Sequence, residues 1–493
     1  MQLGPHSGAE QAIEFALAAR DKGCPAEGLG PLQAALQREP RNARLWQTLG
    51  GVHRALEDSA AAISAYERAA ACAPGDTRAL HGIAQASLEA GRPAVAMFDR
   101  ACTASPGDGA LIIGRAAAQL AQGEGAQAIA DLDAVTANNP LWLEGHRTLA
   151  RLRWQLGERG LFAASLTRAL ASHPRSAELW IALAQLLVEV DAFADAAAVI
   201  ERAGGMIGEH GQLTLIAAQC ASELGFLDRA DQLFARMGAA EDVALIEQRA
   251  RHLLRRQQPD LAAALIEPWL GKPSGQRLWP YAAITWRATG DSRFDWLNRP
   301  ELVAVDELPI ASRLEALASD LRSRHRAIEA PAGQSVRGGT QTDGPLFALE
   351  APAIRELRRD IISAVKRHLA RIGPADPAHP TLRHVGKPFR FAGSWSVRLT
   401  GAGHHRAHIH PQGWFSSALY VSVPTPAEMG AAPSGWLQLG EAPTAINLAL
   451  VPSVELEPVP GRLVLFPSWM WHGTRPIQQG ERLTVAFDVA ACG

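Results

Sequence analysis

The sequence predicts two structural classes in one chain: an all-helical repeat array in the N-terminal part, and a β-sandwich or barrel, here a jelly roll, in the C-terminal part. Two observations predict this order. Prolines recur at a nearly constant interval early in the chain, and short alternating apolar runs separated by Gly, Pro and Ser replace that pattern from Phe389 onward. The length of 493 residues also exceeds what one core usually serves, so two or more domains are expected.

The N-terminal repeat has an interval of about 34 residues, which is typical of a repeated pair of helices. The prolines that mark it are Pro40, Pro74, Pro106, Pro140 and Pro174, and only the step from Pro74 to Pro106 is slightly shorter than the others. Small and large side chains return at fixed offsets, and in one repeat they are Trp46, Leu49, Gly50, Ala62, Tyr66, Ala69 and Pro74. This pattern resembles the tetratricopeptide repeat, a pair of antiparallel helices that must stack on its neighbours to bury its apolar face. The resemblance is clearest over residues 8–205 and fades without ending towards residue 290.

A stack of such helix pairs has a groove, and its usual use is to hold a peptide or a partner protein. We therefore expect residues 1–290 to bind a protein or peptide. A purely structural or dimerising array, which could assemble the chain into a homo-oligomer, is the alternative. The aromatic residues at repeat positions are expected in the core.

The composition argues against several classes of partner. The formal net charge is -2, so no global field attracts nucleic acid or an anionic membrane, and no apolar run reaches the roughly 18 residues of a membrane span. The five cysteines, which are Cys24, Cys72, Cys102, Cys220 and Cys492, show no CxxC spacing. They are expected to be buried thiols in a reducing compartment, which favours a cytoplasmic location.

The helical periodicity breaks after residue 290. Residues 291–345 are interpreted as a linker that leads into the next domain, with a helix over 311–325 and a glycine-rich stretch. Residues 337–342 of that stretch could close over a pocket or form an ordinary turn. Residues 346–493 are expected to form the jelly-roll core, beginning with an amphipathic helix over 351–372. The expected strands are 395–399, 415–423, 435–439, 463–466 and 483–489.

Three histidines and one arginine in this C-terminal part suggest a metal site. His408 and His410 are two residues apart, which on a strand puts both imidazoles on one face, and His472 follows far enough on for other strands to return it to the same place. Neutral imidazole suits iron, zinc, copper and nickel, and three protein ligands leave positions open for catalysis. Arg482 stands in an otherwise apolar strand and needs an anionic partner, and Thr484 lies on its face. His404 and His405 are interpreted as solvated loop residues.

The order of these motifs resembles the 2-oxoglutarate/Fe(II)-dependent oxygenases, and within them a bacterial and phage group of prolyl-hydroxylase-like proteins. The residues that carry the resemblance, over about 295–490, are the 334–342 stretch, His408 to Pro411, Trp414, Ser416, Ser417, Tyr420, the Gly461–Ser468 run, His472, Arg482 and Thr484. The resemblance implies a double-stranded β-helix. It implies that His408 and His472 bind iron and that Arg482, with Thr484 beside it, holds the distal carboxylate of 2-oxoglutarate. Tyr420 or Trp395 would line the cofactor pocket.

The sequence departs from this family at one position. Most members have Asp or Glu two residues after the first histidine, and His410 stands there instead. His410 is expected to be the third ligand, which would make the site one charge more positive. It could also stand behind the ligands, leaving two histidines and waters. Otherwise the site would belong to a three-histidine dioxygenase that does not use 2-oxoglutarate, which Arg482 argues against.

The resemblance implies an enzyme that uses Fe(II), 2-oxoglutarate and O2 to hydroxylate a substrate. With a repeat array in front, the expected substrate is a protein or peptide side chain. Two alternatives stay open at this point. The array could be the working part of a protein-binding scaffold whose jelly roll is inactive, or the enzyme could act on a small molecule and use the repeats for assembly.

Overall fold

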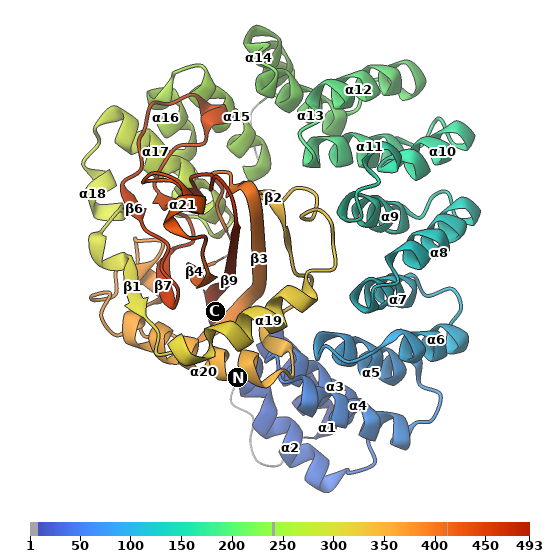
Figure 1. The fold of residues 1–493 in the computed structure, drawn as a ribbon. Helices are drawn as coiled ribbons and strands as arrows, with labels where there is room; N and C mark the ends of the chain where they lie inside the picture. Colours follow the sequence, from blue (N-terminus) through green and yellow to red (C-terminus); the bar gives the residue numbers. More distant parts are fainter. Residues whose placement is uncertain (1–7, 239–241, 412) are drawn as a thin grey trace.

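The structure is a computed structural model that describes residues 8–238, 242–411 and 413–493. A curved array of helix pairs comes first, and it surrounds a β domain formed by the C-terminal part of the chain (Figure 1). The β domain consists of two antiparallel sheets and not of a closed barrel. The predicted order of tetratricopeptide-like helical repeats followed by an antiparallel jelly roll is therefore confirmed.

Consecutive helices of the array form antiparallel pairs. Their bounds are α1 (Ala9–Asp21), α2 (Leu29–Arg38), α3 (Ala43–Ala55), α4 (Ser59–Cys72), α5 (Thr77–Glu89), α6 (Val95–Ala104), α7 (Gly109–Gln122), α8 (Gly125–Asn138), α9 (Leu143–Gln155), α10 (Ala164–Ser172), α11 (Ala177–Glu189), α12 (Phe193–Ile207), α13 (Gly211–Glu223), α14 (Leu227–Arg236), α15 (Val243–Arg255), α16 (Pro259–Leu270), α17 (Trp279–Thr289) and α18 (Arg293–Leu297). Among all described helices, none combines the length and the apolar character that a membrane crossing needs.

The turn inside each helix pair contains a residue with positive φ. In the described chain these residues are Gly23, Glu57, Gly91, Gly123, Gly157, Asp191, Gly225, Gln257 and Gly290. A left-handed residue just past a helix lets the chain reverse at once, and glycine adopts this conformation without the cost that a Cβ atom imposes. The turns recur at nearly the interval of the sequence repeat up to Gly290, so the repeat geometry continues where the side-chain pattern fades.

These turns form the edge of the array that faces the β domain. At several glycine turns the contact is made through backbone carbonyls: Gly23 accepts from the Cys492 thiol at 3.3 Å, Ala90 from the amide of Glu350 at 3.1 Å, and Gln155 from the amide of Ile328 at 2.8 Å. The three turns without glycine use their side chains as well, and at the first of them the Leu56 carbonyl also accepts from Arg358 at 3.0 Å. The pairs are Glu57 with Arg358, Asp191 with both Arg337 and Arg406, and Gln257 with the carbonyl of Asn447. The array thus holds its own C-terminal domain along its inner edge.

The β domain has a large and a small sheet. The strands are β1 (Ala304–Glu307), β2 (Val336–Gln341), β3 (Phe389–His405), β4 (Phe415–Ser422), β5 (Leu437–Leu439), β6 (Val454–Leu456), β7 (Arg462–Pro467), β8 (His472–Thr474) and β9 (Glu481–Ala491). The large sheet has the order β1-β7-β4-β9-β3-β2 and the small sheet the order β6-β5-β8, with every pair antiparallel.

The two faces of the large sheet have different coverings. Helices α19 (Leu314–Arg324) and α20 (Pro352–Leu369) pack on one face, against Leu483, Val485 and Phe487 of β9. Because side chains alternate along a strand, Arg482 and Thr484 point to the opposite face, towards the small sheet. One face therefore packs under α19 and α20, and the other combines apolar residues with the polar side chains of the cavity.

Most of the predicted helices and strands are present, but the prediction for the glycine-rich stretch was wrong. The expected helices correspond to α19 and α20, and the expected strands to β3, β4, β5, β7 and β9. Residues 337–342, expected as a loop or turn, lie mainly in the edge strand β2, which pairs with β3. Its pattern was not recognisable because the strand has little apolar alternation and includes Gly339, where a Cβ atom would come 2.3 Å from the carbonyl oxygen of Arg398.

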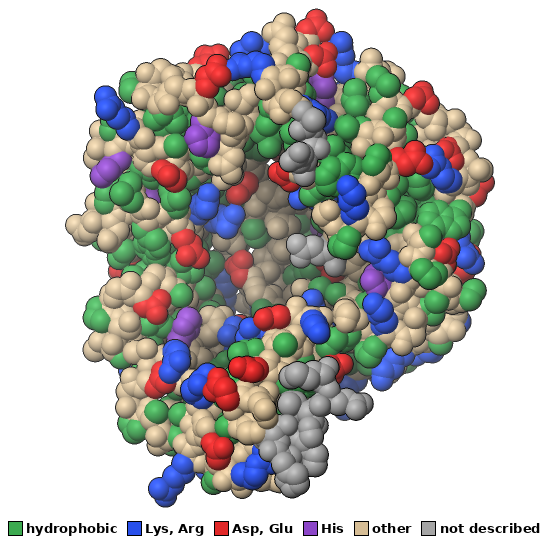
Figure 2. All heavy atoms as spheres, turned by 180° about the vertical axis from the view of Figure 1, so that it is seen from behind, with side chains coloured by type: hydrophobic (Ala, Val, Ile, Leu, Met, Phe, Trp, Pro, Cys, Tyr) green, Lys and Arg blue, Asp and Glu red, His purple; other side chains and the backbone are tan. Residues whose placement is uncertain are grey.

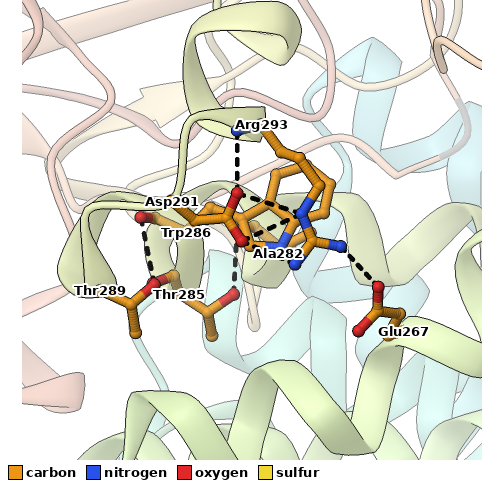
Figure 3. Close-up of polar contacts among 7 residues, drawn as sticks. All are labelled: Glu267, Ala282, Thr285, Trp286, Thr289, Asp291 and Arg293. Atoms are coloured by element: carbon orange, nitrogen blue, oxygen red, sulfur yellow. Dashed lines mark hydrogen bonds and ion pairs between the residues drawn. The ribbon is translucent and has the colours of Figure 1, made fainter.

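The end of the array packs on the β domain. The indole of Trp471 donates to the carbonyl of Pro280 in α17 at 3.0 Å, and its ring contacts Tyr281. Beyond α17, Arg293 joins Asp291 to Glu267 of α16 and lies over the ring of Trp286 (Figure 3). Helices α15 to α17 share one apolar core with β4, β5 and β7. Because this core includes residues from both sides of residue 290, the domain boundary expected there stays a prediction.

All five cysteines are free thiols, as expected. Only Cys24 and Cys220 are buried, however, and the other three are half-buried. The expectation of five buried thiols was therefore wrong, because three of them lie at helix ends or at the end of β9, where cover is incomplete.

Exchanging the residues of two equivalent turns tests how much the ion pairs of a non-glycine turn contribute to the free energy of unfolding. Asp191 has φ 61° and two arginine partners, whereas Gly225 has φ 81° and open space where a Cβ atom would lie. Gly225→Asp adds the backbone cost without a partner, so we expect it to lower the free energy of unfolding by about 1 kcal/mol. Asp191→Gly removes exposed ion pairs but relieves the backbone, so we expect it to lower the free energy of unfolding clearly less than Gly225→Asp does. Urea unfolding of both variants checks this, and equal losses would contradict it.

Candidate functional site

The metal-ligating candidates meet where the two sheets come together. β3 ends at His405, so His408 and His410 lie just beyond it and not on a regular strand as predicted. His408 forms an isolated antiparallel bridge with His472, the first residue of β8. The His408 amide donates to the His472 carbonyl at 2.9 Å, and the His472 amide donates to the His408 carbonyl at 3.0 Å. After β3 the chain leaves the large sheet, and at His408 it pairs with β8 of the small sheet. His408 and His410 therefore lie outside the regular hydrogen-bond ladder of β3.

The three imidazoles nevertheless form one cluster, as the spacing predicts. The ring centroids of His408 and His472 are 4.1 Å apart, and that of His410 lies 5.1 Å from each of them. One nitrogen of each ring lies within 4.8 Å of the others. No other group of three or more such residues in the described part of the chain is placed to hold a metal ion.

The hydrogen bonds of the rings orient the cluster. The Nδ1 atoms have acceptors in the Arg406 carbonyl for His408 (2.9 Å), the Met470 carbonyl for His472 (3.0 Å) and the Asp488 carboxylate for His410 (2.6 Å). Because carbonyl and carboxylate oxygens only accept, each Nδ1 must carry the proton. In the neutral form of each ring Nε2 is then the nitrogen that can bind a metal ion, and that of His408 lies within hydrogen-bond distance of the Ser335 hydroxyl.

Burial keeps two of these rings uncharged. It lowers the pKa of His408 to about 3 and the pKa of His472 well below its usual value, and the neighbouring imidazoles act in the same direction. Both rings are consequently neutral at neutral pH. Neutral imidazole is the form that binds Fe(II), so the donor set fits such an ion.

Arg482 lies on β9 in the same cavity and is 2% exposed. Its Nη1 donates to the Gly435 carbonyl at 2.7 Å and its Nη2 to the Thr474 hydroxyl at 3.2 Å, but its buried Nε has no acceptor. No carboxylate of the described residues forms an ion pair with it, and burial lowers its pKa. A buried guanidinium without an anion is costly, so the site fits a carboxylate ligand.

The other predicted pocket residues lie in this cavity as well. The hydroxyl of Tyr420 is buried without a hydrogen-bond partner, and burial raises its pKa. Thr484 contributes a hydroxyl whose bond to the Val397 carbonyl is long, at 3.4 Å. The Trp395 ring lies 5.5 Å from that of His410. The structure thus brings together all seven residues singled out in the sequence, around one cavity.

Further residues of the site were missed or misinterpreted. His405, expected in a solvated loop, ends β3 and lines the cavity, because the strand extends further than its apolar pattern suggests. The Ser335 hydroxyl lies 3.0 Å from His405 Nδ1 and 3.2 Å from His408 Nε2. Nothing in the local sequence indicates Ser335. Asp488 could have been found, since it stands an even number of residues after Arg482 on the same strand.

The repeat array reaches the rim of this site. Arg406, two residues before His408, forms an ion pair with Asp191 of the α11–α12 turn at 2.6 Å, and Arg337 joins the same carboxylate at 2.9 Å. Seen from behind, the molecule has a deep hollow between the array and the β domain (Figure 2). The array is therefore part of the surroundings of the candidate site.

Comparisons with known proteins follow the division of the fold. Residues 393–488 match the family described as "Putative 2OG-Fe(II) oxygenase", and residues 13–77 and 48–109 match the tetratricopeptide repeat. The first of these ranges contains His408, His410, His472, Arg482 and Asp488. No curated protein matches the chain.

Several solved structures match parts of the chain. A tetratricopeptide repeat protein from Parabacteroides merdae is 21% identical, covers 49% of this chain and 96% of its own, and has a TM-score of 0.29. A Pseudomonas putida prolyl-4-hydroxylase is 20% identical, with coverages of 39% and 94% and a TM-score of 0.28. HygX from Streptomyces hygroscopicus, solved with nickel, 2-oxoglutarate and hygromycin B, is 15% identical, with coverages of 38% and 83% and a TM-score of 0.26.

The two family matches lie in the two parts of the fold that the sequence predicts, the repeats in the helical array and the oxygenase match across β3 to β9. The chain therefore contains a tetratricopeptide-repeat region and a domain that matches the 2OG-Fe(II) oxygenase family.

Proposed function

We propose that this chain is an Fe(II)- and 2-oxoglutarate-dependent dioxygenase that hydroxylates a side chain of a protein or peptide recruited by the repeat array. One observation carries the enzymatic part. A buried arginine without an acidic partner shares a cavity with three imidazoles whose Nδ1 atoms already have acceptors, which leaves the Nε2 atoms to bind a metal ion. In this arrangement a binding site for a divalent metal ion lies next to a binding site for a carboxylate ligand.

The proposal gives each residue a role. His408, His410 and His472 hold Fe(II) through Nε2, and Arg482 pairs with the distal carboxylate of 2-oxoglutarate. Tyr420 and Thr484 offer hydroxyls to the same ligand, and Trp395 packs beside it. Fe(II) with bound 2-oxoglutarate and O2 supplies the oxidant for hydroxylation, while the protein orients the reactants. The buried, unpaired Nε of Arg482 favours this enzyme over a three-histidine dioxygenase without 2-oxoglutarate and over an inactive scaffold.

The recruitment of a protein depends on which part of the array is free. In the described chain, the turns at Gly123 and Gly225 make no hydrogen bond or ion pair with residues 304–493. Beside the second of these turns, helices α12, α13 and α14 form a groove whose lining is mostly apolar, with Glu201, Glu209, Arg229 and Arg236 among its residues. It includes Phe226, which is 63% exposed, and Met206 on α12 is 57% exposed. Such exposed apolar surface suits a protein or peptide partner.

Anaerobic titration with Fe(II) and 2-oxoglutarate tests the reaction class. We expect a weak visible charge-transfer band in the wild type. His472→Ala and Arg482→Ala should both lack it, the first because a metal ligand is missing and the second because the ligand carboxylate loses its cation. Arg462→Ala, which removes an arginine paired with Glu307 outside the cavity, is the control and should keep the band. Bound metal without any band in the wild type would exclude 2-oxoglutarate.

The buried hydroxyl of Tyr420 gives a second test, through Tyr420→Phe. Without ligand the hydroxyl has no partner, so its removal should leave the free energy of unfolding unchanged or raise it. With ligand a hydrogen bond is lost, and the Kd for 2-oxoglutarate should rise about tenfold, equivalent to roughly 1.4 kcal/mol. Calorimetry and urea unfolding measure the two quantities. A destabilised apo-protein with unchanged 2-oxoglutarate affinity would assign Tyr420 to the core alone.

The groove at α12–α14 can be tested by placing a charge in it. Incubation of the enzyme with Fe(II), 2-oxoglutarate and a mixture of proteins should add the mass of one oxygen atom to particular peptides, read by mass spectrometry. Phe226→Asp should reduce this modification roughly tenfold, as expected for the loss of a central aromatic contact. It should leave the uncoupled turnover of 2-oxoglutarate intact. Leu161→Asp, at another exposed position of the array, is the matched control. Equal modification by all three proteins would remove the groove from substrate binding.

A further inference from the structure

One of the three histidines of the cluster differs from the others in its hydrogen-bond partner. The Nδ1 atoms of His408 and His472 bond to backbone carbonyls, which are neutral. The Nδ1 of His410 bonds instead to the carboxylate of Asp488 at 2.6 Å. His410 also occupies the position where most members of the resembled family have the acidic ligand.

Asp488 is held in place by further contacts. The Ser416 hydroxyl donates to Oδ1 of Asp488 at 2.7 Å and lies 2.9 Å from the hydroxyl of Ser468. The Ser468 carbonyl in turn accepts from the backbone amide of His410 at 3.0 Å. The carboxylate, the two serines and the histidine thus form one closed network, which fixes the ring of His410 in its orientation.

The basic partner of Asp488 is an imidazole. Its side chain is 15% exposed, and among the described residues neither a lysine nor an arginine forms an ion pair with it. Its side-chain partners are the His410 imidazole and the Ser416 hydroxyl. The carboxylate therefore lies directly behind His410, on the Nδ1 side of the ring, where a carboxylate partner orients a ligating imidazole and strengthens its Nε2 as a donor.

A charge count leads to the same result. Two neutral histidines and one carboxylate around Fe(II) leave a net charge of +1, whereas three neutral histidines leave +2. Adding Asp488 behind His410 restores +1. The imidazole transmits the effect, because a carboxylate on Nδ1–H makes Nε2 a stronger donor.

We propose that Asp488 is a positioning residue that supplies, through the Nδ1–H of His410, the negative charge that the three-histidine cluster lacks. This inference depends on the proposed function, because it assumes that the cluster binds a metal ion. It makes His410 a true ligand rather than a residue behind the ligands. It also makes β9 contribute to both halves of the site, with Arg482 at one end and Asp488 six residues on.

The experiment compares three variants of the full chain. Asp488→Asn keeps the shape and removes the charge, and Ser416→Ala keeps the charge and removes one bond that holds it. Glu481→Gln makes the same chemical change on the same strand, at a similarly buried acid (20% exposed) that pairs with Arg322 and Arg398 instead. Co(II), which is stable in air, and anaerobic Fe(II) are the probes. The Kd for each metal, the Fe(III)/Fe(II) potential and the urea unfolding of the metal-free proteins are measured.

Asp488→Asn should raise the Kd for Co(II) roughly ten- to a hundredfold and shift the Fe(III)/Fe(II) potential upward. Urea unfolding of its metal-free form shows separately whether the variant is as stable as the wild type, so a loss of metal affinity can be told from a loss of structure. Ser416→Ala should have a smaller effect on the Kd, and Glu481→Gln none. A merely structural role for Asp488 would instead lower metal-free stability and leave the potential unchanged.

Two results would overturn the inference in different ways. If the wild type binds Co(II) and Fe(II) and Asp488→Asn binds them equally well, Asp488 has no role in the site, while the proposed enzyme stands. If the wild type binds neither metal, the inference and the proposed function both fail.

Discussion

The alternation of side chains along β9 is the constraint on which the rest of the C-terminal domain depends. The strand pairs with β3 on one side and β4 on the other, so it lies inside the large sheet. Its odd-numbered residues Leu483, Val485 and Phe487 complete the apolar core under α19 and α20. The even-numbered positions are thereby committed to the opposite face, where Arg482 lines the cavity and Asp488 contacts His410. A shift of one residue would exchange the two sets and destroy core and site together.

The metal cluster depends in addition on a junction between the two sheets. The paired backbone bonds of His408 and His472 join the segment after β3 to the start of β8. This junction fixes the two rings close together through backbone bonds that do not involve the imidazoles. Side-chain bonds then decide which nitrogen of each ring faces inward. Ligands held in this way by backbone and side-chain bonds lose less conformational entropy when they bind an ion.

Much of this arrangement could be predicted from the sequence, because it follows from local periodicity. The helix pairs depend on the regular spacing of prolines and small residues, and the strands that carry Arg482 and Thr484 depend on alternation with apolar neighbours. What could not be predicted depends on contacts between distant segments. Ser335 reaches His408 only because the edge strand β2 pairs with β3, and the glycine-rich sequence of β2 gives no pattern to recognise. The extended course of His408 to His410 outside a regular strand likewise results from tertiary pairing.

The inner edge of the array has a consequence for the length of the array. Free solenoids can gain or lose a repeat, since each repeat contacts only its neighbours. Here the turns at Gly23, Glu57, Gly91, Gly157, Asp191 and Gln257 each meet a different point on the enclosed domain. Inserting or deleting one helix pair would displace every later turn from its point of contact. The size of the β domain thus fixes the number of helix pairs, because each pair must reach its own point of contact on that domain.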